Sequence, residues 1–117
     1  MVKNTGNTVP DSGDIVWLNF NPVSGHEQKG KRPALVITPL AYNRASGLCF
    51  VLPVTSKEKG YPFEVPLPEG TKITGVVLVD QGRTVDWKAR KAEKIESVPV
   101  ETMKRVKVLL KTLFGIE

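Results

Sequence analysis

Short apolar segments recur along the chain at close spacing, and proline, glycine or charged residues end each of them. Runs of about four to eight β-prone residues bounded by turn residues are typical of strands. We therefore expect strands at 14–20, 32–37, 48–54, 63–65 and 75–79, and a last hairpin-like pair at 84–87 and 94–95. About five to seven such strands predict a mainly β fold, a small half-open barrel.

Two of these segments differ in how their apolar residues are arranged. Residues 48–54 are almost continuously apolar, which predicts a strand buried on both faces. The segment 14–20 partly alternates, so we expect Ile15, Trp17 and, if the alternation continues, Asn19 on one face. Pro33 should lie at the first residue or the edge of its strand, because proline donates no ladder hydrogen bond.

The C-terminal segment has a helical period instead. Apolar residues recur every three or four positions from Val100 to Phe114, which predicts an amphipathic helix covering the barrel. Pro99 is suited to be its first residue, and Gly115 to end it. A short helical turn is also expected at 40–44.

The length of 117 residues is that of one domain. Residues 1–12 are polar and small, so we expect a flexible leader followed by a single domain at 13–117. The N-terminus lacks the apolar core of a signal peptide, and no apolar run approaches membrane-spanning length, so we expect a cytoplasmic protein.

The net charge and the cysteine count limit which partners, disulfides and metal sites this protein can have. A net charge of +5 and a pI of about 9.5 favour a polyanionic partner, either a nucleic acid or an acidic protein. One cysteine excludes an internal disulfide, and its apolar neighbours predict a buried, unreactive thiol at Cys49. One histidine and one cysteine far apart do not form a metal-ligand set, so we expect no metal and no cofactor.

The charged segment 25–33 connects the first two expected strands. It contains the chain's only histidine, His26, with Glu27 beside it, and the cations Lys29, Lys31 and Arg32. If the polyanion is RNA, metal-free cleavage requires a base for the 2′-hydroxyl, charge stabilisation at the phosphoryl oxygens and a proton for the 5′-oxygen.

These residue types fit those three requirements. Glu27 and His26 are proton-transfer groups, and the Arg32 guanidinium can bind two phosphate oxygens at once. Arginine is a poor proton donor because its pKa lies above ~12, so charge stabilisation is the better role for Arg32. Thr55, at the end of a strand, could add a hydroxyl to the same phosphate.

Simpler structural explanations remain open for several residues. The loop could be a solvated surface, and Arg32 an edge charge that discourages aggregation. Trp17 and Trp87 could stack on bases, although core packing explains both more simply. Asp80 and Arg83 flank a Gln-Gly turn and could serve that turn alone.

Four segments together resemble one family of proteins. They are Gly-Asp-Ile-Val-Trp at 13–17, Gly-His-Glu-Gln-Lys-Gly-Lys-Arg-Pro at 25–33, Pro-Val-Thr-Ser at 53–56 and Asp-Gln-Gly-Arg-Thr-Val-Asp-Trp-Lys-Ala-Arg at 80–90. In this order and spacing they are similar to the MazF/PemK (Kid) toxins, the mRNA interferases of bacterial toxin–antitoxin systems. The segment Gly-Tyr-Pro-Phe-Glu-Val at 60–65 is most like the MazF branch, whereas His26 and 80–90 are closer to Kid.

The resemblance implies an SH3-like barrel with a C-terminal helix, assembled as a symmetric homodimer. It also implies metal-independent cleavage of single-stranded RNA at a short sequence, which leaves a 2′,3′-cyclic phosphate and a 5′-hydroxyl. The implied partner is an antitoxin whose acidic, disordered tail occupies the RNA groove, and a basic chain suits that role.

The resemblance also assigns residues. Arg32 and Thr55 correspond to the family's catalytic pair, Glu27 to a catalytic or RNA-contacting position, and His26 to a position implicated in Kid-like members. We expect RNA contacts from the matching segments, at Gln28, Lys31, Ser56, Lys57, Tyr61, Asp80, Arg83 and Arg90. One departure is Leu78, where Kid-like members carry an arginine, so a mechanism that needs this second arginine does not transfer. Either Glu27 or His26 would then be the base.

Two other functions compete with the nuclease. The ending Phe-Gly-Ile-Glu at 114–117 is faintly similar to that of the CcdB-type toxins, which poison gyrase, but the 27–32 loop argues against that class. A barrel that binds RNA without cutting it is the other alternative. For the nuclease, we expect the loop from Lys57 to Tyr61 to be mobile and to take part in substrate gating and base selection.

Overall fold

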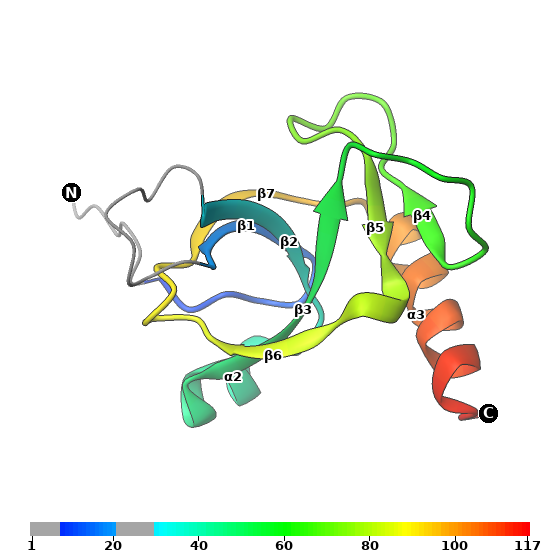
Figure 1. Ribbon diagram of the computed structural model, residues 1–117. Helices are drawn as coiled ribbons and strands as arrows, with labels where there is room; N and C mark the ends of the chain where they lie inside the picture. The colour runs from blue at the N-terminus through cyan, green and yellow to red at the C-terminus, as the bar shows by residue number, and fades with distance from the viewer. Residues whose placement is uncertain (1–7, 21–29) are drawn as a thin grey trace.

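A computed structural model describes residues 8–20 and 30–117. Seven strands form one antiparallel sheet in the described part of the chain (Figure 1). Their bounds are β1 (Asp14–Asn19), β2 (Lys31–Val36), β3 (Leu48–Thr55), β4 (Glu64–Pro66), β5 (Val76–Leu78), β6 (Arg83–Asp86) and β7 (Glu93–Ser97). The other elements are α2 (Leu40–Ser46), the short 3-10 helix η1 (Val79–Gln81) and α3 (Val100–Phe114).

The sheet is organised around β3. The order of the paired strands in the sheet is β4-β5-β3-β2-β1-β7, and β6 also pairs with β3. The first half of β3, from Leu48 to Val51, pairs with β6, whereas Val54 and Thr55 pair with β5. Because one strand joins two sets of partners, the sheet bends around its core. The path ends at β4 and β7 without closing, which confirms the expected half-open barrel with a C-terminal helix (Figure 1).

Both faces of the central strands are buried. One apolar cluster contains Ile15, Leu35 and Leu52 and packs against α3, and a second contains Val16, Leu18 and Cys49. The expectation for β3 is confirmed. β1 is buried on both faces as well, since Ile15 belongs to the first cluster and Val16 and Leu18 to the second, while Trp17 is half-buried.

The last two strands do not form the expected hairpin. β6 pairs with β3, and β7 pairs with β1, on opposite sides of the sheet. A compact turn after β6 separates them, with the Ala89 N–H donated to the Asp86 carboxylate at 2.9 Å. Trp87 follows β6 and is buried in the core, where its indole N–H donates to the Asn43 carbonyl at 2.9 Å. Core packing is therefore confirmed for Trp87.

The middle of the terminal helix α3 packs against the core, and its end is exposed. Val106 is fully buried, whereas Val108 and Phe114 are each 61% exposed. Pro99 has extended backbone and caps the helix, so Val100 is the first helical residue, one position later than expected. Gly115 ends the helix in the left-handed conformation, as expected. Among the described residues, no helix is both long and apolar enough to cross a membrane.

Part of the expected leader is packed against α2. The Asn43 side chain is buried and donates its amide to the Pro10 carbonyl at 2.8 Å. The Asp11 carboxylate accepts the Leu40 N–H at 3.0 Å, at the start of the helix. Residues 8–12 thus hold the first strand to α2, while residues 1–7 lie outside the described part.

The buried thiol of Cys49 makes a prediction about pH. Desolvation raises its pKa from 9.0 to about 12, so the native thiol stays protonated where an unfolded one ionises. Its contribution to the stability of the fold is complete below pH 9 and is lost as the pH rises from about 9 to about 12.

At pH 8, a thiol-specific disulfide reagent should therefore label Cys49 much more slowly in native protein than in urea-unfolded protein, because the thiolate is the reactive species. The absorbance of the released thiolate measures both rates. Native labelling as fast as that of the unfolded chain would contradict the assignment.

Candidate nucleic-acid interface and catalytic groove

Two adjoining cavities lie where β2 begins and β3 ends. Their volumes are about 460 and 420 Å³. Arg32, Val54, Thr55 and Lys57 line both of them, so the cavities form one continuous depression, here called the Arg32–Thr55 groove. The first cavity extends to Phe20, and the second to Trp17 and the segment 72–74.

The register of the sheet brings Arg32 and Thr55 together. β2 and β3 are antiparallel, with Ala34 opposite Pro53. Continued by two residues, the same register places Arg32 opposite Thr55, and residues directly opposite in a sheet project from the same face. The two positions lie on different strands and are far apart in sequence, so the pairing of the strands creates the site.

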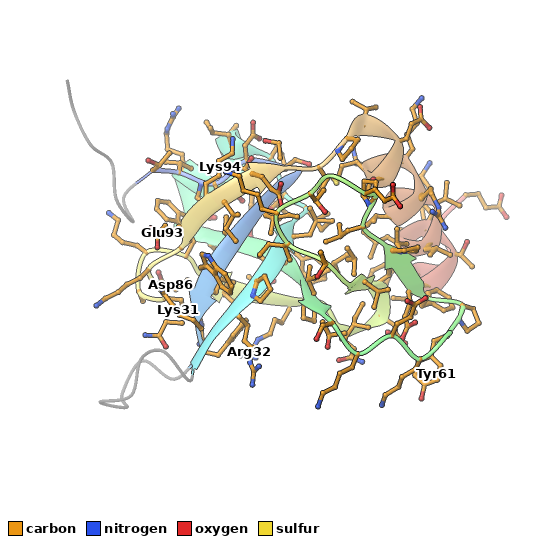
Figure 2. All side chains as sticks on the ribbon, turned by 90° about the horizontal axis from the view of Figure 1, so that it is seen from above. Lys31, Arg32, Tyr61, Asp86, Glu93 and Lys94 are labelled. Carbon is orange, nitrogen blue, oxygen red and sulfur yellow. The ribbon has the colours of Figure 1, made fainter. Side chains whose placement is uncertain are left out.

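Pro33 is compatible with this geometry. It is the third residue of β2 and pairs with Trp17 on β1, whereas the pairing of β2 with β3 begins at Ala34. Proline thus occupies a position where the ladder to β3 does not require its N–H. Arg32 is exposed at the start of the strand beside Lys31 (Figure 2).

The groove is lined by positive charge. None of its lining residues in the described part is Asp or Glu. Five cations line it: Lys31, Arg32, Lys57, Lys72 and Arg83. Lys31 is in an ion pair with Glu93 at 3.7 Å, at a half-exposed site where such a pair stabilises little. Among the described residues Arg32 has no ion pair, so its fork of N–H donors faces solvent. Such a surface attracts a polyanion and binds phosphate oxygens.

Thr55 is oriented by the turn that follows it. The backbone N–H of Lys57 donates to the Thr55 hydroxyl oxygen at 3.1 Å. That bond uses one lone pair of the oxygen and leaves the hydroxyl proton available to a ligand. Ser56 and Lys57, both expected RNA contacts, lie in the same turn and line the groove.

Glycine at position 75 allows β5 to approach Thr55. Its φ is +126°, and a Cβ there would lie 2.2 Å from the Thr55 carbonyl oxygen. Any side chain must therefore displace the end of β3. A non-glycine residue would also be strained in this conformation.

Phe20 lines the first cavity and contacts two guanidinium groups. Arg83 is 5.2 Å and Arg90 5.4 Å from its ring centre, at cation–π distances. The Arg90 guanidinium also donates to the Asn19 carbonyl at 3.3 Å. Arg83 thus lines the groove, whereas Arg90 contacts Phe20 without lining either cavity.

Two more expected RNA contacts, in addition to Arg90, do not line the groove. Asp80 is exposed on η1, where its neighbour Gln81 lines the first cavity instead. Tyr61 is 55% exposed, 6.0 Å from the Lys59 ammonium, and is well separated from Arg32 in Figure 2. Leu78, in place of the Kid-like arginine, pairs with Glu64 in the sheet and lines neither cavity.

The loop after Thr55 is held by a buried carboxylate. Glu64 is 8% exposed and accepts the backbone N–H groups of Lys59, at 3.1 Å, and Gly60, at 2.8 Å. These hydrogen bonds give the loop, which the sequence predicts to be mobile, a defined conformation next to the groove residue Lys57.

The remaining assigned residues lie outside the described part of the chain. They are His26, Glu27 and Gln28, so the choice between the two candidate bases stays a prediction. No cluster of three or more potential metal ligands occurs within residues 8–20 and 30–117.

Sequence reasoning missed Phe20, Lys72 and Gln81 as groove residues. Gln81 and Lys72 carried no signal beyond their polarity, because the loops that contain them reach the groove only through the folded sheet. Phe20 had a signal, since it follows a strand immediately before the charged loop. For Trp17, where the sequence favours core packing over base stacking, the structure shows a half-buried side chain that lines the second cavity.

Gly75 allows a matched test of this geometry. Gly75→Ala should lower the free energy of unfolding by about 1–3 kcal/mol more than Gly70→Ala, because overpacking adds to the backbone strain. Gly70 also has a positive φ, +98°, but a Cβ at that position would meet no atom within 4 Å. Urea unfolding of both variants measures the difference, and equal losses would show that β5 does not abut Thr55.

Comparison with known proteins agrees with the fold. Residues 11–114 match the family described as PemK-like, MazF-like toxins of type II toxin–antitoxin systems. The endoribonuclease toxin MazF of Escherichia coli K12 is 44% identical over 107 residues, which cover 92% of this chain and 96% of that protein. The endoribonuclease PemK of Escherichia coli is 42% identical over 107 residues, covering 88% and 80%.

A solved structure extends the agreement to three dimensions. The matching chain is from a crystal structure of MazE-MazF of Deinococcus radiodurans, with a TM-score of 0.85 and 45% identity. The alignment covers 94% of this chain and 99% of that one. The chain therefore belongs to the PemK-like, MazF-like family of toxins of type II toxin–antitoxin systems.

Proposed function

We propose that this toxin is a metal-independent endoribonuclease that cleaves single-stranded RNA at a short sequence bound in the Arg32–Thr55 groove. Cleavage of mRNA inhibits translation and growth. The observation that carries the proposal is that Arg32, Thr55 and Lys57 line both cavities of a groove without a lining carboxylate in the described part of the chain. The relatives at 42–44% identity, named endoribonucleases, support the same activity.

The chemistry begins with the 2′-hydroxyl beside the scissile phosphate. Glu27 or His26 removes its proton, the 2′-oxygen forms a bond to phosphorus, and the bond from phosphorus to the 5′-oxygen breaks. The departing 5′-oxygen takes up a proton, so the products are a 2′,3′-cyclic phosphate and a 5′-hydroxyl.

Arg32 and Thr55 stabilise the charge that accumulates on the phosphoryl oxygens. The guanidinium donates two parallel N–H hydrogen bonds to these oxygens. The Thr55 hydroxyl, whose oxygen already accepts the Lys57 N–H, donates one O–H hydrogen bond to them. Lys31, Ser56 and Lys57 bind the neighbouring backbone, while Arg83 and the Phe20 ring that it contacts form the opposite side of the groove.

The proposed partner is a MazE-like antitoxin. MazE accompanies MazF in the Deinococcus radiodurans structure. An acidic antitoxin segment would occupy the cationic groove in place of RNA. The toxin acts in the cytoplasm as a homodimer, and the exposed apolar residues of α3 leave surface for such contacts. Sedimentation equilibrium of the free toxin tests the dimer, and a monomer mass would contradict it.

The direct test is incubation with long, mixed-sequence single-stranded RNA in excess EDTA. Discrete cuts with 5′-hydroxyl ends are expected, with none in DNA of the same sequence, because the nucleophile is the 2′-hydroxyl. Arg32→Ala should lower kcat about 10²–10³-fold, the usual effect of losing a transition-state donor. Arg44→Ala, a change of an exposed arginine on α2, should leave cleavage unchanged.

Fully active Arg32→Ala would disprove the assignment of that residue. Intact RNA from folded, antitoxin-free toxin would favour a plain RNA-binding barrel, and trapped gyrase–DNA complexes without RNA cleavage would favour a gyrase poison.

Base selection is assigned to the loop from Lys57 to Tyr61. It follows Lys57 directly out of the groove and is held by Glu64, so RNA that extends past Thr55 and Lys57 would meet its side chains. Exchange of residues 58–61 for those of a relative with another cleavage sequence, with Glu64 retained, should change the sites cut in the RNA. Mapping of product ends measures this, and an unchanged preference would refute the assignment.

A further inference from the structure

The outer wall of the second cavity is formed by a loop far from the catalytic pair in sequence. Lys72, Ile73 and Thr74 line that cavity together with Arg32 and Lys57. The loop connects β4 to β5 and is closed at its base, where the Leu67 N–H donates to the Gly75 carbonyl at 2.9 Å. Lys72 is exposed and, among the described residues, has no ion pair.

Glu96 on β7 holds this wall in place. One carboxylate oxygen accepts the Lys72 backbone N–H and the other accepts the Ile73 N–H, both at 2.9 Å. Charged acceptors make the stronger class of hydrogen bond, and two parallel bonds also restrict orientation. The carboxylate binds the backbone of Lys72 and not its ammonium group, so the lysine charge remains available in the groove.

Two further contacts order the same loop. The Thr71 hydroxyl is 2.7 Å from the Ile73 carbonyl and 3.0 Å from the Pro68 carbonyl. The Ile73 side chain packs against the first apolar cluster. Glu96 thus acts on a loop whose other hydrogen bonds are local, and it connects that loop to β7.

We propose that Lys72 binds an RNA phosphate next to the one held by Arg32 and Thr55, and that Glu96 is the positioning residue that holds Lys72 there. The inference rests on the proposed RNA cleavage and extends its substrate site by one phosphate. A contact to a non-reacting phosphate is made equally in the ground state and the transition state, so it lowers KM and leaves kcat unchanged.

The test compares Lys72→Gln and Glu96→Gln with wild type. Binding is measured by fluorescence anisotropy of a labelled single-stranded oligodeoxynucleotide, which lacks the 2′-hydroxyl, and cleavage kinetics are measured on RNA. Loss of one phosphate contact should make the slope of log affinity against log salt about 0.7 less steep than in wild type. The affinity lost by the variant relative to wild type should therefore be about five-fold greater at 0.1 M salt than at 1 M. KM should rise for Lys72→Gln while kcat stays unchanged.

Glu96→Gln can change the affinity for the oligonucleotide in two opposite directions. Removal of a negative charge alone should strengthen binding to a polyanion, whereas loss of the clamp should weaken it. Glu101→Gln on α3 removes the same charge outside the groove and measures the first effect, and Lys111→Gln is the matched control for Lys72. The double variant should bind no more weakly than Lys72→Gln alone, because Glu96 acts through Lys72.

Unchanged affinity and salt slope in Lys72→Gln would overturn the proposal, as would Glu96→Gln binding as tightly as Glu101→Gln. Lys72 is exposed, so its variant tests the proposal even if Glu96→Gln fails to fold. Wild type that binds the oligonucleotide but leaves RNA intact would refute the proposed function instead, and the anisotropy series would still decide the role of Lys72.

Discussion

The register between β2 and β3 is the constraint on which the groove depends. With Ala34 opposite Pro53, the start of β2 lies beside the end of β3, and Arg32 and Thr55 line the same cavities. A shift by one residue would send each side chain to the other face of the sheet. Burial on both faces, at Leu35 and Leu52 in one cluster and Val36 and Val51 in the other, makes such a shift costly. The apolar core thus secures the site geometry.

Loops complete the groove, and carboxylates hold two of them. Glu64 binds two backbone N–H groups of the loop after Thr55, and Glu96 binds two in the loop that carries Lys72. Neither acid lines the groove, and both contact backbone, so they order its walls without adding a carboxylate to its lining. The lining itself stays cationic, which suits a phosphate backbone bound along its length.

Several features were predictable from local sequence because they depend on neighbouring residues. Residues 48–54 form a strand buried on both faces, and Gly115 ends α3 in the left-handed conformation that glycine permits. Local patterns failed where a distant partner decides the structure. Residues 84–87 and 93–97 have the composition of strands, but the open edges of β3 and β1 determine their pairing. Burial on both faces of β1 also depends on distant segments, because Ile15 lies in the cluster that packs against α3 and Val16 lies in the other cluster.

By itself the sequence determined the β-rich fold, the terminal helix, the positive charge and, through motifs in a specific order, the family and its candidates Arg32 and Thr55. Those properties are carried by residue type and local spacing. The tertiary structure alone decided that Lys57, Lys72 and Arg83 share a groove with that pair, that Asp80 and Tyr61 stay outside it, and that Glu96 reaches across 24 residues to the loop of Lys72. The reason is physical: strand pairing and burial bring distant segments together, and neither is encoded within any one segment.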